Sequence, residues 1–96
     1  MASTKEYRDY ILEQLEILDS INCRPMMGEY LLYYRDTLFG GIYDDRLLVK
    51  KTNNNKIFNM KEIIPYKNAK PMYFIENTDN PNYIKNIIIT TFKDLK

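Results

Sequence analysis

Apolar residues recur at helical spacing near the beginning of the chain. Ser3 and Glu6 precede this stripe at the spacing of a capping box, in which each side chain bonds a free backbone N–H of the first turn. The spacing therefore predicts a helix that starts near Ser3 and buries one face. The predicted core positions of this helix are Tyr7, Ile11, Leu15 and Leu18.

A second helical pattern closes the chain. Asp79 or Asn80 can cap a helix there, and Pro81 follows in the first turn, where its missing N–H has no intrahelical partner to lose. Apolar residues then recur three to four positions apart. This stripe consists of Ile84, Ile87, Ile88, Phe92 and Leu95.

Between the two helices the period changes to that of strands. Residues 30–34 are all tyrosine or leucine, with the aromatic and branched character of β-strands. Arg35-Asp36-Thr37 and Asp44-Asp45 are turn-forming stretches. We therefore predict an antiparallel meander with a first strand over 30–34, a second over 38–43 and a third over 46–50.

Two adjacent glycines fall inside the second predicted strand. Gly40 and Gly41 are unfavourable there unless a bulge, a bend or a large neighbouring side chain needs the room. We expect tyrosines of the partner strand to fill that room, with one packed over the bare Cα of Gly41.

The segment after the meander has a weaker pattern. Residues 52–56 are polar and Asn-rich, and the scattered apolar residues over 57–64 suggest a short helix or an irregular covering segment. Pro65 and Pro71 bracket a loop, and 72–75 predicts one more strand. The whole order predicts one domain over 1–96, an α+β fold of two layers in which the N-terminal and C-terminal helices pack on an antiparallel meander sheet.

Composition narrows the class of protein. The 96 residues are 45% hydrophobic, enough for one core. A single cysteine, and the absence of a leader or a long apolar run, predict a cytoplasmic protein without membrane contact. The net charge is +1, but residues 1–45 hold four basic and nine acidic side chains, a balance of −5, which leaves +6 for the remainder. We expect the two halves to interleave in space, so that these charges are solvated faces.

The candidate chemistry is sparse. The chain has no histidine, which removes the commonest general base and metal ligand. Cys23 stands beside Arg24, which could lower the pKa of its thiol, yet a lone cysteine in a strand is usually a small buried group. Asp44-Asp45 lacks the spaced ligands of a calcium loop. We therefore predict no enzyme, no metal and no cofactor.

Two segments carry a resemblance to a known family. RPMMGEYLLYYRDTLFGGIYDDRLLVK and IIPYKNAKPMYFIE are similar to motifs of the N-terminal domain of TfoX, a bacterial competence regulator also called Sxy. The resemblance implies a two-layer fold without known catalysis, and a regulatory role related to competence or transcription. Methionines at such positions are expected to fill core space. The residues that match the motifs are Met26, Met27, Gly28, Gly40, Gly41, Pro65, Tyr66, Ala69 and Lys70.

The main functional hypothesis is a protein-interaction module. Helices on one face of the sheet would leave a tyrosine-bearing second face for a protein partner or a second copy of the chain. An alternative is a small nucleic-acid or ligand-binding domain that uses the aromatic sheet face with Lys50, Lys51, Lys56 and Lys61, although we expect no strong DNA binding by this chain alone. A third is a minor enzyme that uses Cys23. The predicted interaction surface is Tyr30, Tyr33, Tyr34 and Tyr43.

Overall fold

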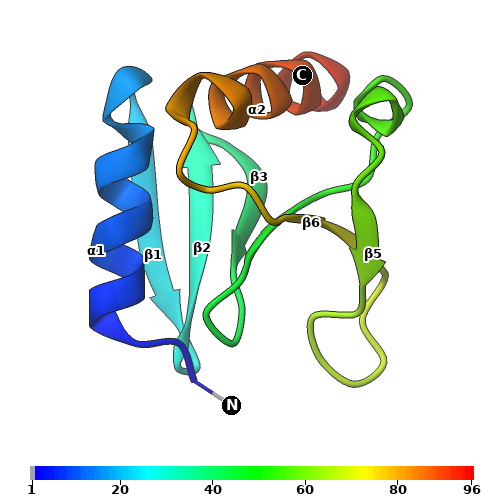
Figure 1. The fold of residues 1–96 in the computed structure, drawn as a ribbon. Helices are drawn as coiled ribbons and strands as arrows, with labels where there is room; N and C mark the ends of the chain where they lie inside the picture. The colour runs from blue at the N-terminus through cyan, green and yellow to red at the C-terminus, as the bar shows by residue number, and fades with distance from the viewer. Residues whose placement is uncertain (1) are drawn as a thin grey trace.

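The computed structural model describes residues 2–96 and shows an α+β fold. A six-stranded antiparallel sheet has the strand order β1-β2-β3-β4-β6-β5, with the N-terminal and C-terminal helices packed against it (Figure 1). The helices are α1 (Lys5–Gln14) and α2 (Pro81–Leu95), and short 3₁₀ helices cover Leu15–Ile17 and Asn55–Phe58. The strands are β1 (Ile21–Met26), β2 (Glu29–Tyr34), β3 (Thr37–Ile42), β4 (Leu47–Val49), β5 (Lys61–Ile63) and β6 (Met72–Ile75).

The predicted meander is confirmed as β2, β3 and β4, but the two edge strands were not predicted. β1 pairs with β2, and β5 pairs with β6 at the opposite edge. Each edge strand is too polar or too short to show a clear period of two. Pro25 is tolerated in β1 because an edge strand has one row of backbone groups without a neighbour.

Each hairpin from β1 to β4 turns in two residues with positive φ. Met27 and Gly28 have φ of 51° and 86°, and Asp44 and Asp45 have 53° and 54°. Turns of this kind match the right-handed twist of the flanking strands. The predicted turn at 44–45 is confirmed, and the predicted connection over 35–37 turns at Arg35 and Asp36, with φ of 48° and 65°, while Thr37 already begins β3. Met27 is 96% exposed at a turn and fills no core space.

Both helices start at a side-chain cap. Asn80 caps α2 as predicted, by accepting from the Tyr83 N–H at 3.2 Å. In α1 the cap is Thr4, whose Oγ1 accepts from the Tyr7 N–H at 3.1 Å, so the prediction of a Ser3 cap is wrong. Ser3 instead donates to Glu29 Oε1 at 2.6 Å, which ties the N-terminus to the start of β2.

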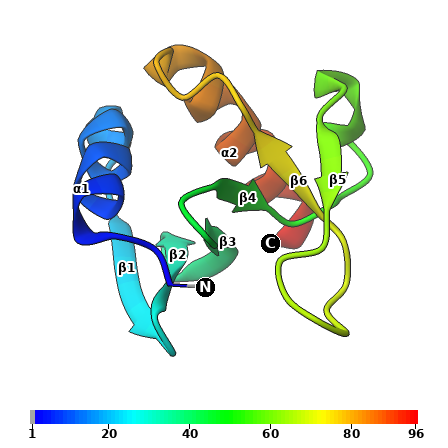
Figure 2. The ribbon, with the colours of Figure 1, turned by 60° about the horizontal axis from the view of Figure 1, so that its bottom comes forward.

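The core lies between the helices and one face of the sheet (Figure 2). Tyr34 of β2 meets Phe92 of α2 edge to face, with ring centroids 4.9 Å apart. The helix stripes predicted from the sequence enter this core, with Leu95 at its margin. We call it the helix-side core, and its buried members are Ile11, Leu15, Leu18, Tyr30, Leu32, Tyr34, Phe39, Ile42, Leu47, Val49, Tyr73, Ile75, Ile84, Ile87, Ile88 and Phe92.

The two glycines of β3 lie where the strands approach closely. A Cβ on Gly41 would stand 2.5 Å from the Tyr30 carbonyl oxygen and 2.8 Å from Tyr43 Cε2. A tyrosine therefore does pack against this glycine, but it follows β3 itself rather than coming from the partner strand. The pairing also slips between Leu32 and Tyr33, a β-bulge of the kind that glycine accommodates.

The Asn-rich connection after β4 is ordered by one buried amide. Asn55 is fully buried, and its Nδ2 donates to the Lys50 carbonyl at 2.8 Å and to Thr91 Oγ1 at 2.9 Å. Its Oδ1 accepts from the Thr52 N–H at 2.9 Å. Asn55 thereby fixes the backbone of Lys50 to helix α2.

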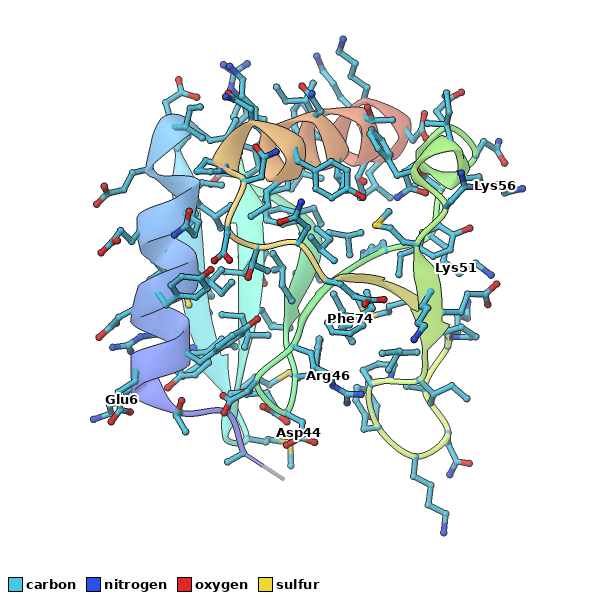
Figure 3. All side chains as sticks on the ribbon, in the orientation of Figure 1. Glu6, Asp44, Arg46, Lys51, Lys56 and Phe74 are labelled. Atoms are coloured by element: carbon cyan, nitrogen blue, oxygen red, sulfur yellow. The ribbon has the colours of Figure 1, made fainter. Side chains whose placement is uncertain are left out.

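The charged halves of the chain separate within the sheet, but they interleave where α2, from the basic half, packs against β3 and the 3₁₀ helix over Leu15–Ile17. The strand order places β1, β2 and β3 on one side of the sheet and β4, β6 and β5 on the other. In Figure 3, Glu6 lies at the α1 side, and Lys51 and Lys56 lie at the β5 side. The balance of −5 over residues 1–45 and the balance of +4 over residues 46–80, from seven basic and three acidic side chains, therefore lie toward opposite sides of the sheet.

Substitution of Gly41 tests the close approach of β2, β3 and Tyr43. Gly41→Val should lower the free energy of unfolding by about 1–3 kcal/mol, because its side chain overlaps backbone as well as a ring. Thermal and urea melts measure the change. Thr37→Val puts the same residue at a roomier position of the same strand and should be near neutral. A Gly41→Val protein as stable as the parent would contradict this packing.

Substitution of Asn55 tests the buried amide. Asn55→Ala leaves the Lys50 carbonyl, the Thr52 N–H and Thr91 Oγ1 without this partner, so the free energy of unfolding should fall by about 1–3 kcal/mol. Urea denaturation measures the loss, and Asn53→Ala at an exposed neighbouring position is the control. Equal stability of the two variants would show that the hydrogen bonds of Asn55 do not hold the connection.

Candidate functional site

The sheet face opposite the helices is also apolar. Strand pairing sets Leu31, Gly41, Leu48 and Phe74 side by side in one row across β2, β3, β4 and β6. Leu48 and Tyr43 are buried yet lie outside the helix-side core. Something other than a helix must therefore cover this face.

The cover is the loop over residues 64–71, between β5 and β6, which Figure 1 shows at the end of the molecule away from α2. The ring of Tyr66 lies 6.1 Å from the ring of Tyr43, centroid to centroid. Pro65 and Pro71 fix φ at the two ends of the loop, and the Ala69 N–H donates to the Tyr66 carbonyl at 3.0 Å. The loop thus forms a wall over the helix-free face.

A pocket of about 770 Å³ remains between this loop and the sheet. Its volume falls within the range of small-molecule sites, roughly 300–1,000 Å³. Methionine, leucine, tyrosine and proline dominate the lining, and its charged groups are three lysines. The lining residues are Met26, Leu31, Leu38, Gly40, Tyr43, Lys50, Lys51, Pro65, Tyr66, Ala69, Lys70, Pro71 and Met72.

The three lysines differ in how their ammonium groups are used. The Lys51 Nζ is 2.9 Å from Glu62 Oε1 and 5.6 Å from the centre of the Tyr73 ring. Hydrogen bonding to Glu62 raises the pKa of Lys51. Since Tyr73 belongs to the helix-side core, the Lys51 ammonium group is engaged away from the pocket. Within residues 2–96, Lys50 and Lys70 form no ion pair within 4.0 Å.

The tyrosines predicted as an interaction surface do not form one. Tyr30 and Tyr34 are 8% and 5% exposed in the helix-side core, and Tyr43 is 5% exposed in the pocket wall. Tyr33 is half-buried on the other face, with the Arg24 guanidinium 5.5 Å above its ring. Alternate strand residues face opposite ways, so the neighbouring tyrosines of β2 lie on two different faces of the sheet.

The residues that carried the family resemblance gather around the pocket instead. Six of them come from two distant segments and contribute to its lining: Met26, Gly40, Pro65, Tyr66, Ala69 and Lys70. Met27 and Gly28 form the β1–β2 turn, and Gly41 lies in the sheet. The motifs held the signal for this site, but only the fold shows that they meet there.

Cys23 has the environment of a structural thiol. Its side chain packs against the helix-side core. Burial raises the pKa of the thiol, and the nearby positive charge that opposes this comes from Arg8 rather than from Arg24. Arg24 points to the other face, where it covers Tyr33. The pairing of Cys23 with Arg24 suggested by the sequence is therefore wrong.

The acid pair of the β3–β4 turn is held by one backbone group and one side-chain carboxylate. Asp45 Oδ1 accepts from the Thr4 N–H at 2.8 Å, and the Asp44 N–H donates to the Glu29 carboxylate at 3.2 Å. Over residues 2–96 no three histidine, cysteine or acidic side chains converge as metal ligands would. The predicted role of Asp44-Asp45 as a turn is confirmed.

No family model matches this chain, and no curated protein matches it. The resemblance to the TfoX N-terminal domain therefore stays a prediction. Neither helix described within residues 2–96 has the length and apolar character needed to cross a membrane.

The environment of Cys23 predicts a thiol that reacts slowly with alkylating reagents. Iodoacetamide should label the native protein more slowly than the urea-unfolded protein at pH 8, because burial reduces access and a raised pKa reduces the thiolate fraction. Raising the pH should increase the native rate without a plateau near neutrality. Native labelling as fast as that of the unfolded chain, or a plateau below pH 7, would revive the hypothesis of a reactive thiol.

Proposed function

We propose that this protein is a non-catalytic binding domain that acts by holding its ligand or partner in the pocket on the helix-free face. The observation that supports the proposal is the pocket itself, formed where the loop over 64–71 covers the sheet incompletely. An apolar cavity of this size with few polar groups is the usual form of a binding site. The resemblance to the TfoX N-terminal domain adds a regulatory role, which binding at this site would serve.

The chemistry of the lining favours binding over catalysis. No carboxylate, thiol or imidazole is among the described residues that line the pocket, so the usual pairs of nucleophile and general base are missing there. Burial raises the pKa of the Tyr43 phenol, and Tyr66 and Glu29 add to the effect. Tyr43 therefore stays neutral and offers a hydrogen bond instead of a base.

A protein partner is the second candidate, and one observation favours it. Ile64 and Tyr66 are 59% and 58% exposed on the loop beside the pocket, and exposed apolar groups that adjoin a cavity are common at protein interfaces. A second copy of the chain is the simplest such partner. Sedimentation of the purified protein at several concentrations separates the two candidates, because self-association raises the mass with concentration.

The neutral fluorescent probe N-phenyl-1-naphthylamine tests the pocket. It should bind the native protein at a ratio of one to one with increased fluorescence, because its aromatic body matches the apolar lining. Ala69→Phe fills part of the pocket and should weaken binding by about tenfold or more, in the range that one well-placed group controls. Asn86→Phe, at an exposed position of α2, adds the same ring elsewhere and should leave binding unchanged.

Such probes also bind partly folded states, so each variant is first shown to melt cooperatively. Absence of saturable binding to the native parent would overturn the proposed function. Equal binding by the Ala69→Phe and Asn86→Phe variants would place the probe outside the pocket and would overturn it as well.

A further inference from the structure

We propose that the pocket selects a small organic anion with an apolar body, whose carboxylate, sulfonate or phosphate group is held by Lys50 and Lys70. This inference rests on the proposed function, since it specifies the ligand of the same site. Three features carry it: the pocket floor, whose strands are paired on both sides; Lys50 and Lys70 at its rim, which form no ion pair within the described residues; and the positive balance of residues 46–80.

The floor offers apolar contact and no backbone hydrogen bonds. It is built on β2 and β3, through Leu31, Leu38 and Gly40, and both strands are paired on both sides within the sheet. An extended peptide therefore finds no free strand edge at this floor for the main-chain pairing that peptide-binding sheets use. Leu31 and Leu38 provide a fixed surface, and Met26 and Met72 can adapt to the shape of a ligand.

The lysines at the rim provide the charge. The Lys50 N–H donates to the Phe39 carbonyl at 2.8 Å, and its own carbonyl accepts from Asn55. Its half-buried side chain therefore extends from a backbone position that hydrogen bonds hold in place. Lys70 comes from the loop wall, next to Pro71, and is exposed. A lysine from the sheet and a lysine from the loop thus border one apolar cavity.

The charges around the pocket leave these lysines available to a ligand. No acidic side chain is among the described residues of the lining, and Glu62 on nearby β5 is already paired with Lys51. Residues 46–80, which form β4, β5, β6 and the loop over 64–71, hold seven basic and three acidic side chains, a balance of +4. A positive field at a cavity with low-dielectric walls attracts anions and strengthens their contacts.

The size of the site favours a small molecule over a nucleic acid. Strong sequence-independent binding to DNA needs many phosphate contacts, whereas Lys50 and Lys70 supply two. A volume of about 770 Å³ holds a compact organic molecule. The apolar lining then binds the body of that molecule while the two ammonium groups bind its anionic end.

Two probes with the same body test the charge preference. 1-Anilinonaphthalene-8-sulfonate differs from N-phenyl-1-naphthylamine by its sulfonate, so the protein should bind the sulfonate probe more tightly. The double variant Lys50→Gln and Lys70→Gln should weaken binding of the sulfonate probe by about fivefold or more, as expected for one or two partly screened ion pairs. Its dissociation constant for the neutral probe should stay within about twofold.

Lys56→Gln is the matched control, because it removes a positive charge at an exposed position on the 3₁₀ helix, shown in Figure 3 beside the end of α2. It should leave binding of both probes unchanged. A second measurement uses the parent alone: salt should weaken binding of the sulfonate probe and not of the neutral probe. This measurement needs no variant to fold.

The outcomes distinguish the two proposals. If neither probe binds, the proposed function fails. If the neutral probe binds while the sulfonate probe binds no more tightly, or with no dependence on salt, the pocket is a binding site without a preference for anions, and this inference is overturned. The inference is also overturned if the double variant binds the sulfonate probe as Lys56→Gln does.

Discussion

Both helices pack on the same face of the sheet, and the rest of the structure depends on this one-sided packing. It buries the helix-side core and leaves a second apolar face whose central row includes Leu31, Leu48 and Phe74. An antiparallel sheet usually presents a polar second face to water. Here that face is apolar, so the loop over 64–71 must cover it, and the pocket lies where this cover is incomplete.

The strand order has an electrostatic consequence as well as a packing one. Because α1 and β1 to β3 precede β4 to β6 in the chain, the acidic residues 1–45 and the basic residues 46–80 lie toward opposite sides of the sheet, while α2 packs across elements of both. The pocket lies under the basic loop and the end of β4. The rim is therefore positive because Lys50 and Lys70 come from the basic part of the chain and the nearby Glu62 is paired with Lys51.

The sequence was sufficient for the elements with a strong period or an obvious turn, which include both helices, the meander and β6. It was insufficient for β1 and β5, because edge strands need no apolar alternation. The cap at Thr4 was missed because Ser3, and not Thr4, is followed three residues later by an acid. Ser3 instead bonds Glu29 across the fold, and Thr4 accepts from the Tyr7 N–H. The tyrosines were misjudged because nothing in a run of neighbouring aromatics says which face a helix will cover.

The sequence did not reveal the pocket because its lining comes from two separate segments, residues 26–51 and 65–72, which only the fold brings together. Packing explains Gly40, since a Cβ there would overlap the backbone of Leu48 and stand 2.8 Å from Val49 Cα. It explains Tyr66 in part, through the contact with Tyr43. Packing does not explain Lys70, which is exposed and, within the described residues, has no ion-pair partner within 4.0 Å. Water alone satisfies an exposed lysine, so a purely structural account leaves the Lys70 ammonium group in solvent. The proposed binding account pairs it with an anion, and Lys70 is therefore the position at which the two accounts diverge.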